Sequence, residues 1–125
     1  NPLSAAAGAA VLEHIADGRV HQRIDELGTQ LRQSLQAVFD RHDIGAVVYG
    51  DTSYWHVSLT GQPLKSGWPG AGGAALKRAL LNEGIHLISN GGFVSASHEE
   101  SDIEQTTNAF DSALTSVVGE GYLAG

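Results

Sequence analysis

The chain has 125 residues, of which 42% are hydrophobic, so it is long and apolar enough to fold as one globular domain with a real core. Seven basic against fourteen acidic residues give a formal net charge of −7, which repels nucleic-acid phosphates and anionic membrane surfaces. The absence of cysteine excludes disulfides, thiol catalysis and zinc–thiolate sites, and it fits a reducing, cytoplasmic setting. Neither nucleic acid nor membrane is therefore expected as a partner.

The first predicted element is an alanine-rich helix at residues 1–18. Asn1 suits the N-cap, Pro2 suits the first helical position, and Gly18 suits the end of the helix. Small side chains let another backbone approach closely, so we expect this helix to pack against a neighbour. Because the chain has no methionine and opens on Asn1-Pro2, we also expect it to have been processed or cut from something longer.

A long amphipathic helix is predicted from Arg19 to about Arg41. Apolar residues recur there at steps of three and four, which is the spacing of one helical face. The residues of this stripe are Val20, Ile24, Leu27, Leu31, Leu35 and Val38.

Residues 44–60 are rich in β-branched and aromatic residues and predict either two short strands or one bulged strand, interrupted at Gly50-Asp51. Strict alternation within 54–59 predicts that one face of this strand is buried. In the glycine-rich loop 61–73 the pair Lys65-Ser66 precedes the "GWPGAGG" run, whereas a phosphate-binding loop needs a Lys-Ser or Lys-Thr pair after its glycines, so a flexible connector is the better interpretation. A helix of about three turns follows and is closed by Gly84.

Two strands, 85–88 and 92–96, are predicted next. Ser97 and Glu100 have the spacing of a capping box, which predicts the start of a last helix. Its buried stripe is expected at Ile103, Thr107, Phe110, Leu114 and Val117. The order of elements predicts an α/β fold in which a small, mostly antiparallel sheet is covered by helices and preceded by the alanine-rich helix.

The residues that carry chemistry form no recognisable catalytic or metal-binding set. The six histidines are scattered: His14 with Asp17 is interpreted as a surface pair, and His98 as a solvent-facing residue at a helix start. No serine has the context of a nucleophile elbow. Neither Lys65 nor Lys77 ends an apolar strand, where burial would activate an amine. No catalytic residue and no metal ligand are assigned.

Several segments in order resemble class III (fold type I) pyridoxal-phosphate-dependent aminotransferases. "NPLSAAAGAAVLEHIADG" resembles the helix after the serine/threonine-glycine segment of that family, and "LGTQLRQSL" the long helix that follows. "YGDTSYWHVSLT", "LKRALLNEGIHLIS" and "GGFVSASHEESDIEQTTNAF" resemble the strands and helices of its small C-terminal domain. In pattern the chain is most similar to the glutamate-1-semialdehyde 2,1-aminomutase-like members.

This resemblance implies a C-terminal portion of a longer homodimeric enzyme. Residues 1–18 would be the terminal helix of the large cofactor-binding domain, and residues 19–125 the small C-terminal domain. The resemblance places the Schiff-base lysine and the other groups that hold pyridoxal 5′-phosphate upstream of Asn1, so the fragment alone would be inactive. Asn1 would adjoin the phosphate-binding segment, and the alanine-rich helix would partly form the subunit interface.

The resemblance also places the turn at Asn90, Gly91 and Gly92 on the substrate side. Glycine there would let the backbone lie close to a small amino substrate. The alternative is that Asn90-Gly91 is a plain type I′ hairpin turn between two strands. The aminomutases usually carry an acidic residue and a longer loop here, so transaminase and aminomutase both stay open.

A second hypothesis is a free-standing, non-catalytic α/β binding or interaction module. The lack of a catalytic set favours it, whereas the lack of a methionine does not. The length of the natural open reading frame upstream of Asn1 distinguishes the two hypotheses.

Overall fold

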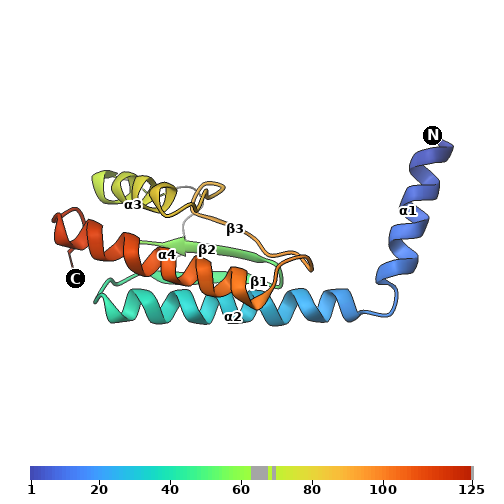
Figure 1. Ribbon diagram of the computed structural model, residues 1–125, viewed down its shortest axis with the longest axis horizontal. Coiled ribbons are helices and arrows are strands. Elements are labelled where there is room, and N and C mark those ends of the chain that lie inside the picture. The colour runs from blue at the N-terminus through green and yellow to red at the C-terminus, as the bar shows by residue number, and fades with distance from the viewer. Residues whose placement is uncertain (63–67, 69, 125) are drawn as a thin grey trace.

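The computed structural model describes residues 1–62, 68 and 70–124, and Figure 1 shows the arrangement of the elements that they form. In chain order these are α1 (Pro2–Ile15), α2 (Arg19–Arg41), β1 (Val47–Asp51), β2 (Tyr54–Ser58), α3 (Gly70–Asn82), β3 (Gly91–Phe93) and α4 (Glu100–Gly119). The strands form one antiparallel sheet in the order β1-β2-β3. The predicted α/β fold with a small antiparallel sheet covered by helices is confirmed.

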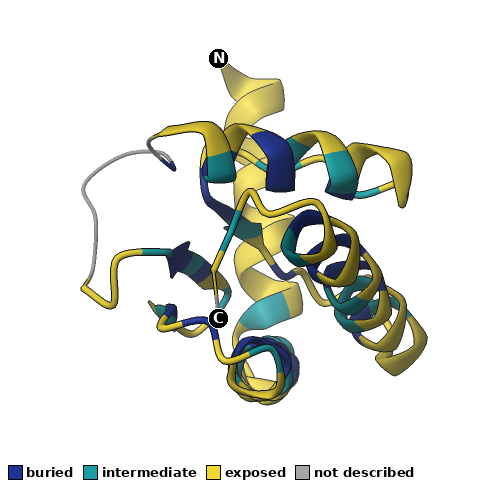
Figure 2. Cartoon of the chain, turned by 90° about the vertical axis from the view of Figure 1, so that its left-hand side faces the viewer, coloured by how far each residue is buried: buried dark blue, intermediate teal, exposed yellow. Residues whose placement is uncertain are grey.

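Helices α2 and α4 supply much of the core. Helix α2 packs against both β1 and α4, and α3 packs against α4. The predicted bounds of α2 are confirmed, and its buried residues are Leu27, Gly28, Leu31, Leu35, Val38 and Phe39. Figure 2, an end-on view, shows the buried residues gathered on the inward sides of the helices and strands.

Phe110 of α4 joins the helices to the sheet. Its ring meets Phe39 of α2 edge-on at a centroid distance of 6.0 Å, and Trp55 of β2 at 6.1 Å. All three side chains are buried. Edge-to-face aromatic pairs add to the stabilisation that burial alone provides, so this trio fixes α2, α4 and β2 relative to one another.

Strands β1 and β2 are two separate strands, one of the two predicted arrangements. They turn at Thr52-Ser53, between the paired residues Asp51 and Tyr54, and not at Gly50-Asp51. Gly50 lies inside β1 with φ 146°, and a Cβ there would overlap the Tyr54 carbonyl oxygen. This glycine therefore serves a close approach of two strands, whereas the sequence indicated a break.

The predicted strand at 85–88 is wrong. Only Ile88 pairs, in an isolated bridge with Gly91, and the Ile85 N–H donates back to Leu80 of α3 at 2.8 Å. Half-buried Ile85 and Leu87 pack on the core instead of extending the sheet. The strand predicted at 92–96 is shorter and begins one residue earlier, as β3.

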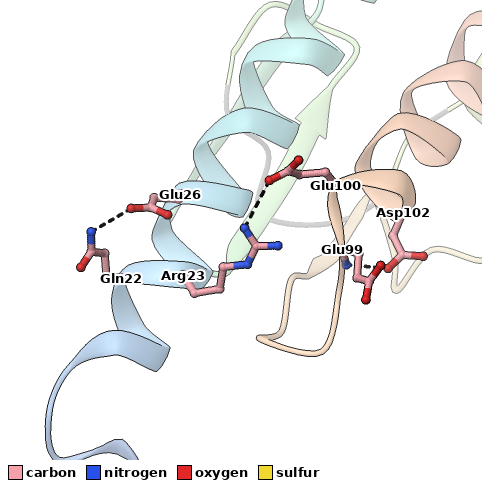
Figure 3. A network of polar contacts seen from close by, with 6 residues as sticks. All are labelled: Gln22, Arg23, Glu26, Glu99, Glu100 and Asp102. Carbon is pink, nitrogen blue, oxygen red and sulfur yellow. Dashed lines mark hydrogen bonds and ion pairs between the residues drawn. The ribbon is translucent and has the colours of Figure 1, made fainter.

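The start of α4 also differs from the prediction. The N-cap is Glu99, and a carboxylate oxygen of Asp102 accepts the Glu99 backbone N–H at 2.8 Å (Figure 3). Ser97 lies outside the helix, because the His98 N–H donates to the Ser95 carbonyl at 3.1 Å and closes a separate turn first. Helix α3, by contrast, starts earlier than expected, at Gly70, and Gly84 follows its end with φ 83° as predicted.

Helix α1 stands away from the rest of the chain (Figure 1). Its predicted cap is confirmed, since the Asn1 side chain accepts the Leu3 N–H at 3.0 Å. The expectation that it packs against a neighbour is wrong within this chain: none of its residues is buried, and Leu3 is 78% exposed. Among the described residues, no helix combines the length and the apolar character needed to cross a membrane.

Candidate functional site

The turn between α3 and β3 contains the predicted substrate-side residues. The Gly91 N–H donates to the Ile88 carbonyl at 3.2 Å, so Ser89 and Asn90 are the central residues of the turn. Ser89 has φ 63°, but Asn90 does not have a positive φ. A type I′ turn requires a positive φ at both central residues, so the prediction of a type I′ turn at Asn90-Gly91 is wrong.

Asn90 anchors this turn to β2. It is 2% exposed, its side-chain amide donates to the Val57 carbonyl at 2.8 Å, and its own carbonyl accepts the Val57 N–H at 2.9 Å. The Trp68 indole N–H donates to the same Val57 carbonyl at 2.8 Å. No sequence pattern indicated this role of Trp68. The buried Val57 carbonyl thus accepts two hydrogen bonds, which hold Trp68 and the turn at Asn90 against β2.

Gly91 and Gly92 are glycines for different reasons. A Cβ at Gly91 would overlap the Trp55 carbonyl oxygen and lie 2.6 Å from His56 Nδ1. A Cβ at Gly92 would make ordinary contact with the Trp55 indole, at 3.4 Å. The close approach at Gly91 is therefore to β2 of the same chain, and Gly92 leaves an uncovered space beside an indole.

Four aromatic side chains cluster on the sheet face opposite Trp55, and we call them the open-face cluster: Tyr49, Tyr54, His56 and Phe93. The ladder pairs Tyr49 with His56 and Tyr54 with Phe93, which places all four on one face. Ring centroids are 5.5 Å apart for Tyr49–His56, 4.2 Å for Tyr54–His56 and 5.1 Å for Tyr54–Phe93. Tyr54 and Phe93 remain exposed.

His56 sits at the middle of the open-face cluster. Its Nε2 hydrogen-bonds the Tyr54 hydroxyl. Its Nδ1 is the one fully enclosed side-chain nitrogen or oxygen without a partner among residues 1–62, 68 and 70–124. Nδ1 is enclosed beside Gly91, and Nε2 is hydrogen-bonded to Tyr54. The imidazole therefore serves packing, and neither nitrogen is accessible to act as a general base.

The described residues do not form a site for pyridoxal phosphate, which the sequence resemblance implies for the parent. Lys77 Nζ lies 6.0 Å from the centroid of the Trp68 ring and forms no ion pair with a described carboxylate. Lys65 lies outside the described residues. Asn1 is at the tip of α1, apart from β3 (Figure 1), so the structure does not bring it together with Asn90, Gly91 and Gly92. Within the described part of the chain, no three His, Asp or Glu side chains meet as a metal site.

The carboxyls with displaced pKa values make structural contacts. His42 Nε2 hydrogen-bonds the Asp111 carboxylate at 2.8 Å and Arg41 pairs with it at 3.2 Å, so α2 and α4 are tied and the pKa of Asp111 is lowered. Hydrogen bonds from the Arg19 backbone and side chain lower the pKa of Asp17. A further surface tie joins Arg23 of α2 to Glu100 of α4 at 3.4 Å, beside a Gln22–Glu26 hydrogen bond within α2 (Figure 3).

No protein-family model matches the chain. Among solved structures, a transaminase with pyridoxal phosphate bound is 31% identical, with a TM-score of 0.79 over 98% of this chain and 29% of its own. An omega-transaminase from Sphaerobacter thermophilus is 24% identical, with a TM-score of 0.83 over 95% of this chain and 29% of its own. At that identity the likeness concerns the fold alone.

A thermostable omega-transaminase engineered for synthesis of bulky amines also matches, at 18% identity and a TM-score of 0.65, over 87% of this chain and 26% of its own. The chain thus spans less than a third of the length of each of these three transaminases. We conclude that these residues have the fold of one part of a transaminase, shared over almost the whole of this chain.

Proposed function

We propose that this chain is the C-terminal part of a class III pyridoxal-phosphate-dependent aminotransferase or aminomutase. The parent would be a cytoplasmic homodimer that transfers an amino group on a small amino-acid-like substrate. The observation that carries the proposal is the match over 98% of this chain, at 31% identity, to 29% of a transaminase solved with the cofactor bound. The same segments carry the resemblance in the sequence, in the same order.

The proposed division is at residue 18, with residues 1–18 belonging to the large cofactor-binding domain and residues 19–125 forming the small domain. Two observations support it. Helix α1 buries none of its residues, whereas the elements from α2 onward share one core. Gly18 joins them with φ 78°, a conformation that glycine adopts without strain. The apolar side chains of Leu3 and Leu12 on this alanine-rich helix are exposed. In the parent, the large domain and a second subunit would bury them.

In this proposal the cofactor supplies the electron sink for amino transfer, and residues outside this chain hold it. Asn1 is the one residue of this chain that we assign to the cofactor, because it would adjoin the segment that binds the cofactor phosphate. The substrate side is assigned to the turn at Asn90, Gly91 and Gly92. Buried Asn90 and Gly91 would set the position of the turn, and half-buried Gly92 would keep the surface beside it free of a side chain.

We further propose that the parent is similar to the glutamate-1-semialdehyde 2,1-aminomutases. The segment "GGFVSASHEESDIEQ" supports this, whereas the short "SNGGF" turn, without an acidic residue, favours a different substrate. Comparing the full-length parent in an amino-shift assay on glutamate 1-semialdehyde and in a transamination assay on a simple amine separates the two activities. Turnover only in the amine assay would remove the aminomutase assignment and leave the transaminase.

The test of the proposal as a whole is the natural reading frame. Expressing the gene from its own start codon should give a protein some three times longer than this chain that binds pyridoxal phosphate and transfers amino groups. A start codon directly before Asn1, with a stable soluble 125-residue product, would instead select the free-standing module. The full exposure of α1 is evidence against that module, because an isolated helix of this length is marginal in water.

A further inference from the structure

A cavity of about 270 Å³ opens between the segment after α3, the end of β3 and the first half of α4. None of residues 89–92 lines it, although Gly92 is paired in the ladder with Trp55, one of its lining residues. Its apolar lining consists of Leu31, Trp55, Ile85, Leu87, Phe93, Val94 and Ile103. Polar groups come from His86, His98, Asp102 and Thr106. An apolar cavity with a few converging polar groups is the usual form of a small-molecule site, and this one has room for about one aromatic ring with a short substituent.

Trp55 lines this cavity and carries an unused hydrogen-bond donor. Its side chain is only 4% exposed, and its indole N–H donates to no acceptor among the described residues. Since His56 Nδ1 is the only fully enclosed unpartnered side-chain atom of the described residues, the Trp55 N–H must reach open space. Buried indole N–H groups normally have a partner, as Trp68 has in the Val57 carbonyl at 2.8 Å.

Gly92 explains why that donor stays uncovered. Trp55 and Gly92 are paired in the ladder and therefore lie on the same face of the sheet. A Cβ at residue 92 would lie 3.5 Å from Trp55 Nε1, in ordinary van der Waals contact. An alanine at this position would fit without strain and would cover the N–H edge. Glycine leaves the edge open.

The polar groups that line the cavity determine which ligand charge it favours. His98 Nδ1 accepts the Ser95 N–H at 3.0 Å, so a neutral His98 carries its proton on Nε2 and can donate from there. Asp102 is the one carboxylate in the lining of this cavity, and one of its oxygens accepts the Glu99 N–H. Its negative charge disfavours an anion, so the donors select an uncharged acceptor.

From these features we infer that the cavity binds a small uncharged aromatic molecule with a carbonyl group, such as an aryl amide, which accepts a hydrogen bond from the Trp55 indole N–H. The apolar body of the ligand occupies the space between Leu31, Val94 and Ile103, and its carbonyl faces Trp55. No pyridoxal-phosphate chemistry is involved, so this inference stands or falls independently of the proposed function.

The test is a titration of the ¹⁵N-labelled chain with benzamide, followed by NMR. The chain has two tryptophans, so it gives two indole N–H signals, which Trp68→Phe assigns. The Trp55 signal should shift and saturate, while the Trp68 signal, whose donor is already engaged, stays in place. Toluene, which lacks an acceptor, should bind about tenfold more weakly. Benzoate should also bind more weakly, because of Asp102.

The matched variant is Gly92→Ala. It should shift the melting temperature by no more than about 5 °C and weaken benzamide binding about tenfold by covering the donor. The inference is overturned if benzamide leaves the Trp55 signal unmoved, if toluene or benzoate binds as well as benzamide, or if Gly92→Ala binds benzamide as tightly as the unchanged chain.

Discussion

At the scale of single residues, the turn at 89–92 combines two kinds of constraint. Asn90 is specified by hydrogen bonds to Val57, and Gly91 by the backbone of Trp55 that passes against it. The sequence marked this turn as unusual and left two explanations for its glycines, a nearby substrate or a type I′ hairpin turn. The actual neighbours of Gly91 lie some 35 residues earlier in the chain, and contacts over that separation leave no local pattern to recognise.

Gly91→Ala should destabilise the chain strongly, because its Cβ would overlap the Trp55 carbonyl oxygen and the strands cannot separate without losing the ladder. We expect a loss of about 3 kcal/mol in the free energy of unfolding, the upper range for overpacking. Urea denaturation measures it. Gly92→Ala is the control and should change stability by less than about 1 kcal/mol, since its Cβ only touches the indole. Equal losses in both variants would contradict the assignment of the close approach to Gly91.

Asn90→Ala should cost about 1–2 kcal/mol, because it removes a buried hydrogen bond while the Val57 carbonyl keeps its Trp68 donor. Asn90→Asp should cost more, since it faces a carboxylate toward a carbonyl oxygen in a buried place. Chemical denaturation of the two variants under one buffer condition gives the comparison. If aspartate proved as stable as asparagine, the amide donor would have no part in holding the turn.

At the scale of elements, the helices followed from the sequence more closely than the strands. The apolar stripe of α2 predicted its bounds, because a helix face is encoded by residues three and four positions apart. Residues 85–88 have the composition of a strand but lack a free strand edge beside them, so only Ile88 makes a bridge. The start of α4 moved from Ser97 to Glu99 because His98 and Ser95 form their own turn first.

The α2–α4 tie at Asp111 predicts a dependence of stability on pH. Hydrogen bonding by His42 and the charge of Arg41 hold the pKa of Asp111 below its ordinary value of 3.8. A carboxyl with a lowered folded-state pKa stabilises the fold above the ordinary value, and this contribution is lost as the pH falls through the lowered pKa. Because the side chain is 44% exposed, the contribution should stay below about 1 kcal/mol.

Urea midpoints measured at about pH 5 and about pH 3 should therefore fall more for the unchanged chain than for Asp111→Asn, which has no carboxyl to protonate. The difference between the two chains isolates this residue from the other carboxyls. An identical fall in both would show that the tie contributes nothing to the folded state.

For helix α1 we predict almost no contribution to the stability of the rest of the chain. Because it buries no residue, deleting residues 1–17 should change the free energy of unfolding of the remaining chain by less than about 0.5 kcal/mol. A matched test of a packed helix is Leu114→Ala in α4, which should cost about 2–5 kcal/mol because Leu114 is fully buried. Thermal unfolding followed by circular dichroism compares them. A large loss on deletion would mean that α1 packs on the core in solution, contrary to Figure 1.

At the scale of the whole molecule, the sequence predicted the fold and the type of protein it resembles, but not which residues face a ligand. The segments that carry the resemblance are spread over the whole chain, so errors in the predicted bounds of single strands do not remove it. The cavity lined by Trp55 is formed by side chains from α2, β2, β3 and α4, among others. These residues are far apart in the chain, so no sequence spacing indicates that they lie together. The open-face cluster and α1 are surfaces that the 125-residue chain leaves uncovered, which agrees with a part of a larger protein.

The most direct measurement is the visible absorption spectrum of pyridoxal phosphate after mixing with the 125-residue chain and, separately, with the protein expressed from the complete natural reading frame. The proposal predicts a stable lysine-bound cofactor spectrum for the complete protein only, because the resemblance places the Schiff-base lysine upstream of Asn1. A stoichiometric cofactor spectrum from the short chain, abolished by Lys65→Ala or by Lys77→Ala, would contradict it.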